Sequence, residues 1–216
     1  DRTPISYATR AKLMARQNQA IPWVDIAERI SLKFQREPLI VSNTGPEGSG
    51  YNYCTFCGRI EPSAIVGSSV VGGSHDKPFP DPRQQHCEDG KVARNIALGT
   101  EFISDILLMQ FKADSYIDIS PTRASTRIAL RTISESLVQA AVRLLALDDS
   151  ELAADFRPAL VAGGPDASLV EIFMYDTLPG GAGFSKLALD QGIKLFETAL
   201  EILENCGRSE EHTSEL

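Results

Sequence analysis

Apolar and polar residues follow two different periods in the second half of the chain. Residues 97–111 predict one long strand whose second half is apolar on both faces, as in the centre of a sheet. Within residues 125–146, apolar side chains recur at helical spacing. Residues 169–175 are β-branched, aromatic and bounded by turn residues, which predicts a further strand. A helix then begins near Phe184, and Gly192 is expected to kink or split it.

The remaining patterns are shorter. Residues 151–161 predict a strand near a sheet edge, because Pro158 cannot donate a ladder hydrogen bond. Residues 39–41 predict a short strand, residues 24–34 fit a strand or a short helix, and residues 1–20 suggest a short helix. Together these elements predict an α+β fold, a mixed sheet with packed helices.

One segment lacks any apolar period, and it contains most of the soft metal ligands. The chain has four cysteines and three histidines. Five of these residues fall within 54–87, a stretch otherwise rich in glycine, serine and proline: Cys54, Cys57, His75, His86 and Cys87. A segment this poor in core residues needs another source of order, and a bound metal would supply it. Two cysteines spaced C-x-x-C and followed by Gly58 are typical of a zinc knuckle.

The sequence leaves the remaining ligands open. Neighbouring side chains of an extended chain point to opposite sides, so His86 and Cys87 are not both expected to reach one ion. His75 with Cys87 would complete a closed Cys3His site, which we favour. His86 in place of Cys87 would instead leave an open, catalytic position. A third alternative is that Cys54 and Cys57 form a redox pair or are idle thiols.

Composition narrows the class of protein. Hydrophobic content is 43% and charged content 23%, as in ordinary globular chains. The formal net charge of −8 is not typical of a free-standing nucleic-acid binder. Clustered cysteines favour metal binding in a reducing compartment, hence a cytoplasmic location, over disulfides. No apolar run is long enough to span a membrane, so we expect no membrane association.

Two further motifs are candidates for contacts with anions. Arg123, Arg127 and Arg131 lie at i, i+4 and i+8 of the predicted helix and could meet phosphates, although such a stripe is more often a solvated face. The turn at Gly180, Gly181 and Gly183 lies between a strand and a helix. It could bind an anion at the helix N-terminus, or it could simply let the chain reverse tightly.

With these segments placed, the chain resembles the MrfA-like zinc-binding domain family. The resemblance covers roughly residues 50–206 and rests on three segments. They are Tyr175-Asp-Thr-Leu-Pro-Gly-Gly-Ala-Gly-Phe184 with the helix ending at Cys206, Leu98-Gly-Thr-Glu-Phe102 with Asp105 and Leu107, and Cys54-x-x-Cys57-Gly58 with His75-Asp-Lys-Pro-Phe79 and Cys87.

The resemblance implies an accessory region at the C-terminal end of superfamily 2 DNA helicases of DNA repair, or of the DrmB component of DISARM phage defence. Such a region would bind zinc, brace a helicase motor present in cis or in trans, and guide DNA without catalysing a reaction. In the family a cysteine cluster follows the last helix, so Cys206 would be the first ligand of a second, truncated site. A stand-alone zinc hydrolase and a protein–protein adaptor are the alternatives.

These expectations divide the chain into four parts. Residues 1–50 are a connecting segment, 51–96 the zinc-binding loop module and 97–207 the α/β core. Residues 208–216 resemble a translated sequencing adapter and are expected to be non-native, in a chain that begins without Met as a fragment would.

Overall fold

The chain forms two compact units in the computed structural model. The structure describes residues 9–13, 21–64, 70–71, 74–79, 82–88, 91–113, 119, 123–161 and 164–205. One unit comprises residues 1–12 and 40–101, and the other comprises residues 13–39 and 102–216. Strands β3 (Ile30–Asn43) and β9 (Leu98–Lys112) contribute residues to both.

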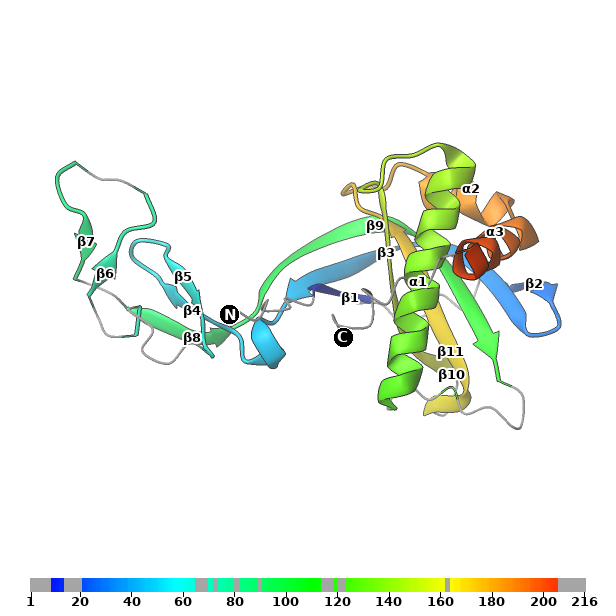
Figure 1. Cartoon of the computed structure of the whole chain (residues 1–216), viewed down its shortest axis with the longest axis horizontal. Coiled ribbons are helices and arrows are strands. Elements are labelled where there is room, and N and C mark those ends of the chain that lie inside the picture. Colours follow the sequence, from blue (N-terminus) through cyan, green and yellow to red (C-terminus); the bar gives the residue numbers. More distant parts are fainter. Residues whose placement is uncertain are drawn as a thin grey trace. The chain divides into compact units, whose positions relative to one another are not determined.

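A six-stranded sheet organises the larger unit (Figure 1). Its strand order is β1 (Thr9–Leu13), β3, β9, β11 (Gly164–Asp176) and β10 (Leu152–Val161), and β2 (Val24–Ala27) pairs with β3. The pairs β2–β3, β9–β11 and β10–β11 are antiparallel. The helices are α1 (Ala124–Leu145), α2 (Phe184–Asp190) and α3 (Ile193–Asn205).

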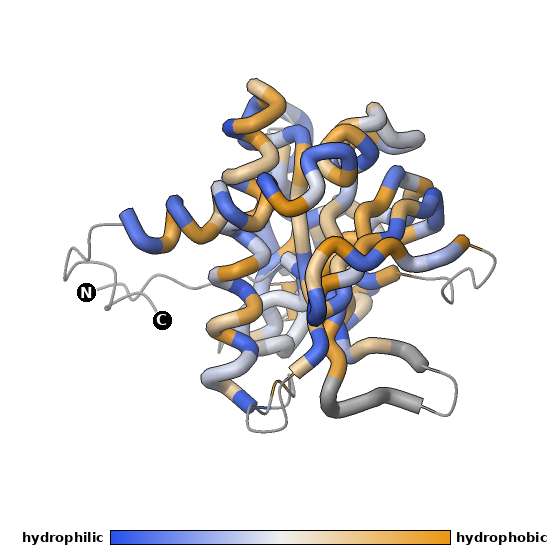
Figure 2. The backbone as a smooth tube through the Cα atoms, turned by 90° about the vertical axis from the view of Figure 1, so that its right-hand side faces the viewer, coloured by the Kyte–Doolittle hydropathy of each residue, from blue (hydrophilic) through white to orange (hydrophobic). Residues whose placement is uncertain are grey.

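The hydrophobic core lies between one face of this sheet and the helices. Successive residues of β11 point to opposite faces, and Ile172 and Met174 on one face join a buried cluster with Leu137 of α1 and Leu195 of α3. Figure 2 shows hydrophobic and hydrophilic residues following one another along each helix. The larger unit therefore has an ordinary apolar core, and burial of this core stabilises it.

The central strand is buried on both faces, as the sequence predicted. Residues 106–109 of β9 are fully buried, and β9 lies between β3 and β11 in the sheet. On the face away from the core cluster, β11 carries Glu171, which is fully buried and accepts a hydrogen bond from Arg157 Nε at 2.8 Å. An ion pair in this position must be kept complete, because a lone buried charge would cost several kcal/mol, about 3–5.

Most predicted elements are present, and the α+β fold class is confirmed. The helix within 125–146 is α1, the strand within 169–175 is the centre of β11, and the last helix divides at Gly192 into α2 and α3. The N-terminal prediction was wrong over residues 9–13, which form strand β1 where a short helix was expected. Residues 1–50, expected to connect, contribute β1, β2 and the long strand β3 to the sheet.

The described residues of the smaller unit form short strands and one 3-10 turn. Strands β5 (Ile60–Pro62), β4 (Tyr51–Cys54) and β8 (Val92–Ile96) form a three-stranded sheet in that order. Strands β6 (His75–Asp76) and β7 (His86–Cys87) pair separately, and the 3-10 helix η1 spans Pro46–Gly48. Sheets of this size are marginal in water unless something else holds them.

The glycine turn after β11 is built around a buried carboxylate. Asp176 is fully buried, and its Oδ2 accepts hydrogen bonds from the backbone N–H of Ala182 at 2.6 Å and of Phe184 at 3.0 Å. Its Oδ1 accepts from Ser185 N at 2.8 Å and from Ser185 Oγ at 2.6 Å. The chain's own carboxylate thus takes the place that an external anion would occupy at the start of α2.

Two further contacts fix this turn against the sheet. Gly180 N donates to Ile103 O at 2.7 Å, and the Arg36 guanidinium donates to Gly180 O. Gly181 has φ +74, and a Cβ at this position would lie 2.5 Å from Asp105 Cγ and 3.0 Å from Asp105 Cβ. Gly181 therefore meets both a backbone and a space requirement, which favours the structural interpretation of the turn.

No helix of the described segments combines the length and the apolar character needed to cross a membrane.

Substitution of two glycines in the turn separates these requirements. Gly183 has φ +86 but nothing within 4 Å of a built Cβ. Gly183→Ala should lower the free energy of unfolding by about 1–2 kcal/mol through backbone strain alone. Gly181→Ala should add about 1–3 kcal/mol for the clash with Asp105. Chemical denaturation of both variants checks this expectation, and equal losses would contradict the role given to Asp105.

Candidate metal centre

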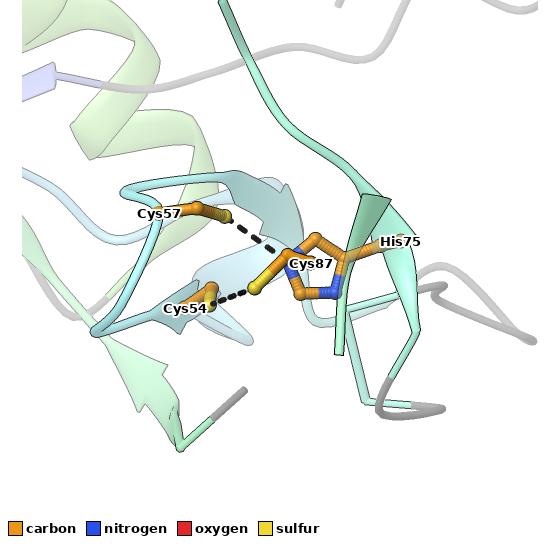
Figure 3. A group of neighbouring side chains, drawn as sticks. All are labelled: Cys54, Cys57, His75 and Cys87. Carbon is orange, nitrogen blue, oxygen red and sulfur yellow. Dashed lines mark hydrogen bonds between the residues drawn. The ribbon is translucent and has the colours of Figure 1, made fainter. Parts of the chain in front are cut away.

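Four side chains of the smaller unit converge on one point. One ligand atom from each of Cys54, Cys57, His75 and Cys87 lies within 4.8 Å of the corresponding atoms of the other three. The closest pairs are Cys54 Sγ with Cys87 Sγ at 3.8 Å and Cys57 Sγ with His75 Nε2 at 3.1 Å (Figure 3). This is the combination of residues that the sequence favoured.

Short strands from separate parts of the segment carry these side chains. Cys54 ends β4, and Cys57 follows in the knuckle that this strand enters. His75 and Cys87 face each other directly, because they are register partners in the β6–β7 pair. Both ligand pairs are therefore set by local backbone pairing, and the cluster joins the two small sheets to each other.

The knuckle backbone adopts the conformation that C-x-x-C-G predicts. Gly58 has φ +80, and its N–H donates to Cys54 O at 2.9 Å. Cys54 N in turn donates to Arg59 O at 2.9 Å. Glycine suits this position because a side chain is disfavoured at positive φ.

The surroundings favour a thiolate at Cys54. Burial acts to raise the pKa of this thiol, but hydrogen bonds from the backbone at Cys57 and Phe56, and contacts with the Cys57 and Cys87 side chains, lower the pKa from 9.0 to about 6. Cys54 and Cys87 are buried together with Val70. Because the thiolate is the form that binds a metal, this environment prepares Cys54 as a ligand.

The donor set fits a tetrahedral zinc ion. With zinc–sulfur bonds of about 2.3 Å, two thiolates of such a site lie about 3.8 Å apart. The Cys54–Cys87 separation of 3.8 Å matches this edge. Three thiols and one imidazole are a common structural zinc set, and four protein donors leave no coordination position for water.

His75 contacts the cluster through one ring nitrogen, and its other ring nitrogen is buried without a partner among the described residues. Its ring is buried, its Nε2 faces Cys57 Sγ, and its Nδ1 has no hydrogen-bond partner within the described segments. A buried polar atom without a partner costs about 1–3 kcal/mol. Coordination of Nε2 would offset that cost and hold the ring in place.

His86, the alternative ligand, lies outside the cluster. Its Nδ1 pairs with Asp76 Oδ1 at 2.9 Å, and the side chain is 63% exposed. It points away because it precedes Cys87 on the same strand, and consecutive strand residues face opposite sides. Cys206 and the tail after it lie outside the described residues.

The arginines and glycines named as candidate anion contacts are not part of the metal cluster. Arg123 precedes α1 as its N-cap residue, and Arg127 is exposed in the first turns of the helix. Arg131 pairs with Glu135 at 2.7 Å and donates to Ala154 O at 3.5 Å. The amides following Gly181 and Gly183 donate to Asp176, as described above.

Sequence reasoning missed the residues that support these features. Val70 packs against the two buried cysteines, but it comes from a segment with no distinguishing pattern. Asp176 carried no usual capping signal, because the N-cap residue of α2 is Gly183 and Asp176 reaches the helix amides only through the folded turn. Asp105 and Arg36 meet the turn only through the sheet, which no local pattern reveals.

The two histidines provide a direct test of the ligand set. His75→Ala and Cys57→Ser should each abolish retention of zinc against a competing chelator, since each removes one of four donors. His86→Ala should leave zinc at about one ion per chain, as in the unmodified protein, because its imidazole pairs with Asp76. Metal analysis of the purified variants measures this. Retention by His75→Ala with loss in His86→Ala would reverse the assignment.

The chain is similar to several known proteins. The model of the MrfA Zn-binding domain family matches residues 133–212. Druantia protein DruE of Escherichia coli (strain UMEA 4076-1) is 31% identical over 182 residues, which cover 79% of this chain and 10% of DruE. The crystal structure of the DUF1998 helicase MrfA bound to DNA matches 94% of this chain and 21% of that chain, with a TM-score of 0.53 at 16% identity.

These matches differ in what they cover. The likeness to the helicase structure, at 16% identity, shows the fold alone. The chain spans about a tenth of the curated relative and about a fifth of the helicase. The four clustered side chains precede residue 133, so their assignment as metal ligands rests on their geometry and not on the family match. Residues 133–212 therefore resemble the MrfA Zn-binding domain family, the family that the sequence motifs also indicated.

Proposed function

We propose that this chain is a zinc-binding accessory region of an ATP-dependent DNA helicase, or of a helicase-associated protein, that acts in DNA repair or phage defence. Its role is structural and DNA-guiding, and it is not catalytic by itself. Zinc binds at Cys54, Cys57, His75 and Cys87. The motor is supplied by the same parent chain or by a partner chain, in a reducing compartment such as the cytoplasm.

The observation that carries this proposal is the closed donor set. Four protein side chains already surround one point in the smaller unit. A zinc hydrolase keeps one coordination position for water, whereas a structural site uses all four for protein ligands. The cluster therefore supports a structural ion, and nothing in its geometry favours the hydrolase alternative.

The larger unit offers a surface for the DNA backbone. Arg127 is exposed near the N-terminus of α1, and no acidic residue lies in the first turn of that helix. A positive side chain at the positive end of a helix dipole is unfavourable unless an anion is near. A DNA phosphate at this end of α1 would satisfy both charges. Arg131 contributes less because Glu135 already pairs with it.

A protein–protein adaptor remains a second candidate, because α2 and α3 leave apolar side chains uncovered. Leu187, Ile193 and Leu200 are 48%, 46% and 55% exposed. A helicase motor could cover these side chains, which would make the two proposals compatible. An adaptor without DNA contact differs in one measurable respect, since it would show no salt-dependent affinity for DNA.

DNA binding measured across a range of salt concentrations tests the proposal. The affinity of the chain should fall as salt rises, and Arg127→Gln should reduce the slope of log affinity against log salt by about 0.9 on duplex DNA. Arg143→Gln, which removes an equally exposed arginine from the last turn of α1, is the matched control and should leave the slope unchanged. An unmodified chain without DNA affinity, or equal effects of the two variants, would contradict the DNA-guiding role.

A further inference from the structure

An exposed aromatic side chain projects from the metal knuckle. Phe56 lies between the two cysteines of the C-x-x-C motif and is 65% exposed. Phe79, between His75 and Cys87 in the sequence, is 78% exposed. Large aromatic side chains are rarely left this open, and neither ring contributes to the buried cluster around the cysteines. Folding of the module does not explain why these two positions are aromatic.

Hydrogen bonds on both sides of Phe56 hold the backbone of the loop that carries it. Thr55, its neighbour, donates to Lys91 O through both its N–H at 2.9 Å and its Oγ1 at 2.8 Å. On the other side, Gly58 N donates to Cys54 O at 2.9 Å. The ring therefore sits on a short loop that is bonded at both ends, so a partner would meet it with little loss of backbone entropy.

Two exposed cationic residues lie on or next to the strand that pairs with the start of the knuckle. Lys91 is exposed next to Thr55, and Arg94 is exposed on β8, the strand that pairs with β4. Among the described acidic residues of the module, Glu61 pairs with Arg59 at 2.8 Å and Asp76 pairs with His86 at 2.9 Å, whereas Glu88 is exposed. An exposed aromatic ring on a loop whose backbone is bonded to that of an exposed lysine matches a nucleic acid strand better than it matches the charge-depleted centre of a protein interface.

We propose that the metal knuckle binds single-stranded DNA, with Phe56 stacking on a base and Lys91 facing a neighbouring phosphate. A phenyl ring has no hydrogen-bonding group, so it recognises the face of any base and gives little sequence preference. A duplex does not offer that face, because its bases are stacked on one another. This inference rests on the proposed DNA-guiding function and assigns the knuckle a part in it.

Abasic DNA separates stacking from attraction to phosphates. The experiment uses the full zinc-loaded chain, fluorescence anisotropy, and a labelled oligothymidylate of about 15 nucleotides, within the range of single-strand site sizes. A matched oligonucleotide carries abasic sites at its centre and keeps every phosphate. Phe56→Ala should weaken binding to the oligothymidylate by roughly 5- to 100-fold and leave binding to the abasic strand unchanged.

Further variants test the chemistry of the contact. Phe56→Leu keeps an apolar side chain without a π face and should lose affinity as Phe56→Ala does, whereas Phe56→Trp should retain it. Lys91→Gln should reduce the salt slope by about 0.7 on both strands. Leu200→Ala removes an apolar side chain of similar exposure, 55%, from α3 and serves as the control with no effect.

Three outcomes would overturn the inference. They are no binding of single strands by the unmodified chain at low salt, equal effects of Phe56→Ala on the two oligonucleotides, and full affinity in Phe56→Leu. Zinc content is measured on each variant, so that loss of the knuckle is not mistaken for loss of stacking. If Phe56 proves silent while zinc and the Arg127-dependent binding persist, the accessory-region proposal stands without this contact.

Discussion

The meeting of three sulfurs and one imidazole is the constraint on which the smaller unit depends. Its strands are too short to be stable by backbone pairing, since β6 and β7 have two residues each. Among its described residues, the buried cluster around the cysteines consists of Val70 with Cys54 and Cys87. A bound ion changes this balance, because the binding free energy of a structural zinc, about 10–16 kcal/mol, becomes folding free energy. The four ligands thus replace the hydrophobic core that this sequence lacks.

The larger unit is stabilised by burial of apolar side chains. Apolar side chains from β9 and β11 pack against α1 and α3, and no metal is required for that core. Two of its buried carboxylates have partners within the same unit. Asp176 accepts hydrogen bonds from amides at the start of α2, and Glu171 pairs with Arg157. A region built in this way can keep its shape while the metal module responds to its own ligand chemistry. That separation agrees with the accessory role proposed above.

The sequence predicted most features that depend on local chemistry. Helix α1, strand β11 and the break at Gly192 follow from periodicity and from glycine, and the Cys3His cluster follows from C-x-x-C-G with two later ligands. Strand alternation predicted only that His86 and Cys87 would not share one site; the choice between His75 and His86 stayed open until the structure placed His75 beside Cys57. These predictions succeeded because each depends on residues close together in sequence or on a ligand set with few alternatives.

Features set by distant contacts could not be predicted. The full length of β3 was not predicted, because Lys33, Gln35 and Glu37 alternate along it as surface residues would, yet all three are buried. The sequence indicated only a short strand at 39–41 and, as one alternative, a strand within 24–34. Residues 9–13 contain a pattern compatible with a helix, and pairing in the large sheet makes them a strand. The fit of Gly181 against Asp105 depends on how β9 meets the turn. In each case tertiary contacts, which local propensity does not contain, determine the outcome.

X-ray absorption at the zinc K edge of the purified chain tests the central claim most directly, because it reports the atoms bound to the ion. A closed site at Cys54, Cys57, His75 and Cys87 predicts three sulfur neighbours at about 2.3 Å and one nitrogen at about 2.0–2.1 Å. Two sulfurs with additional oxygen or nitrogen neighbours, or a shell without sulfur, would contradict the account.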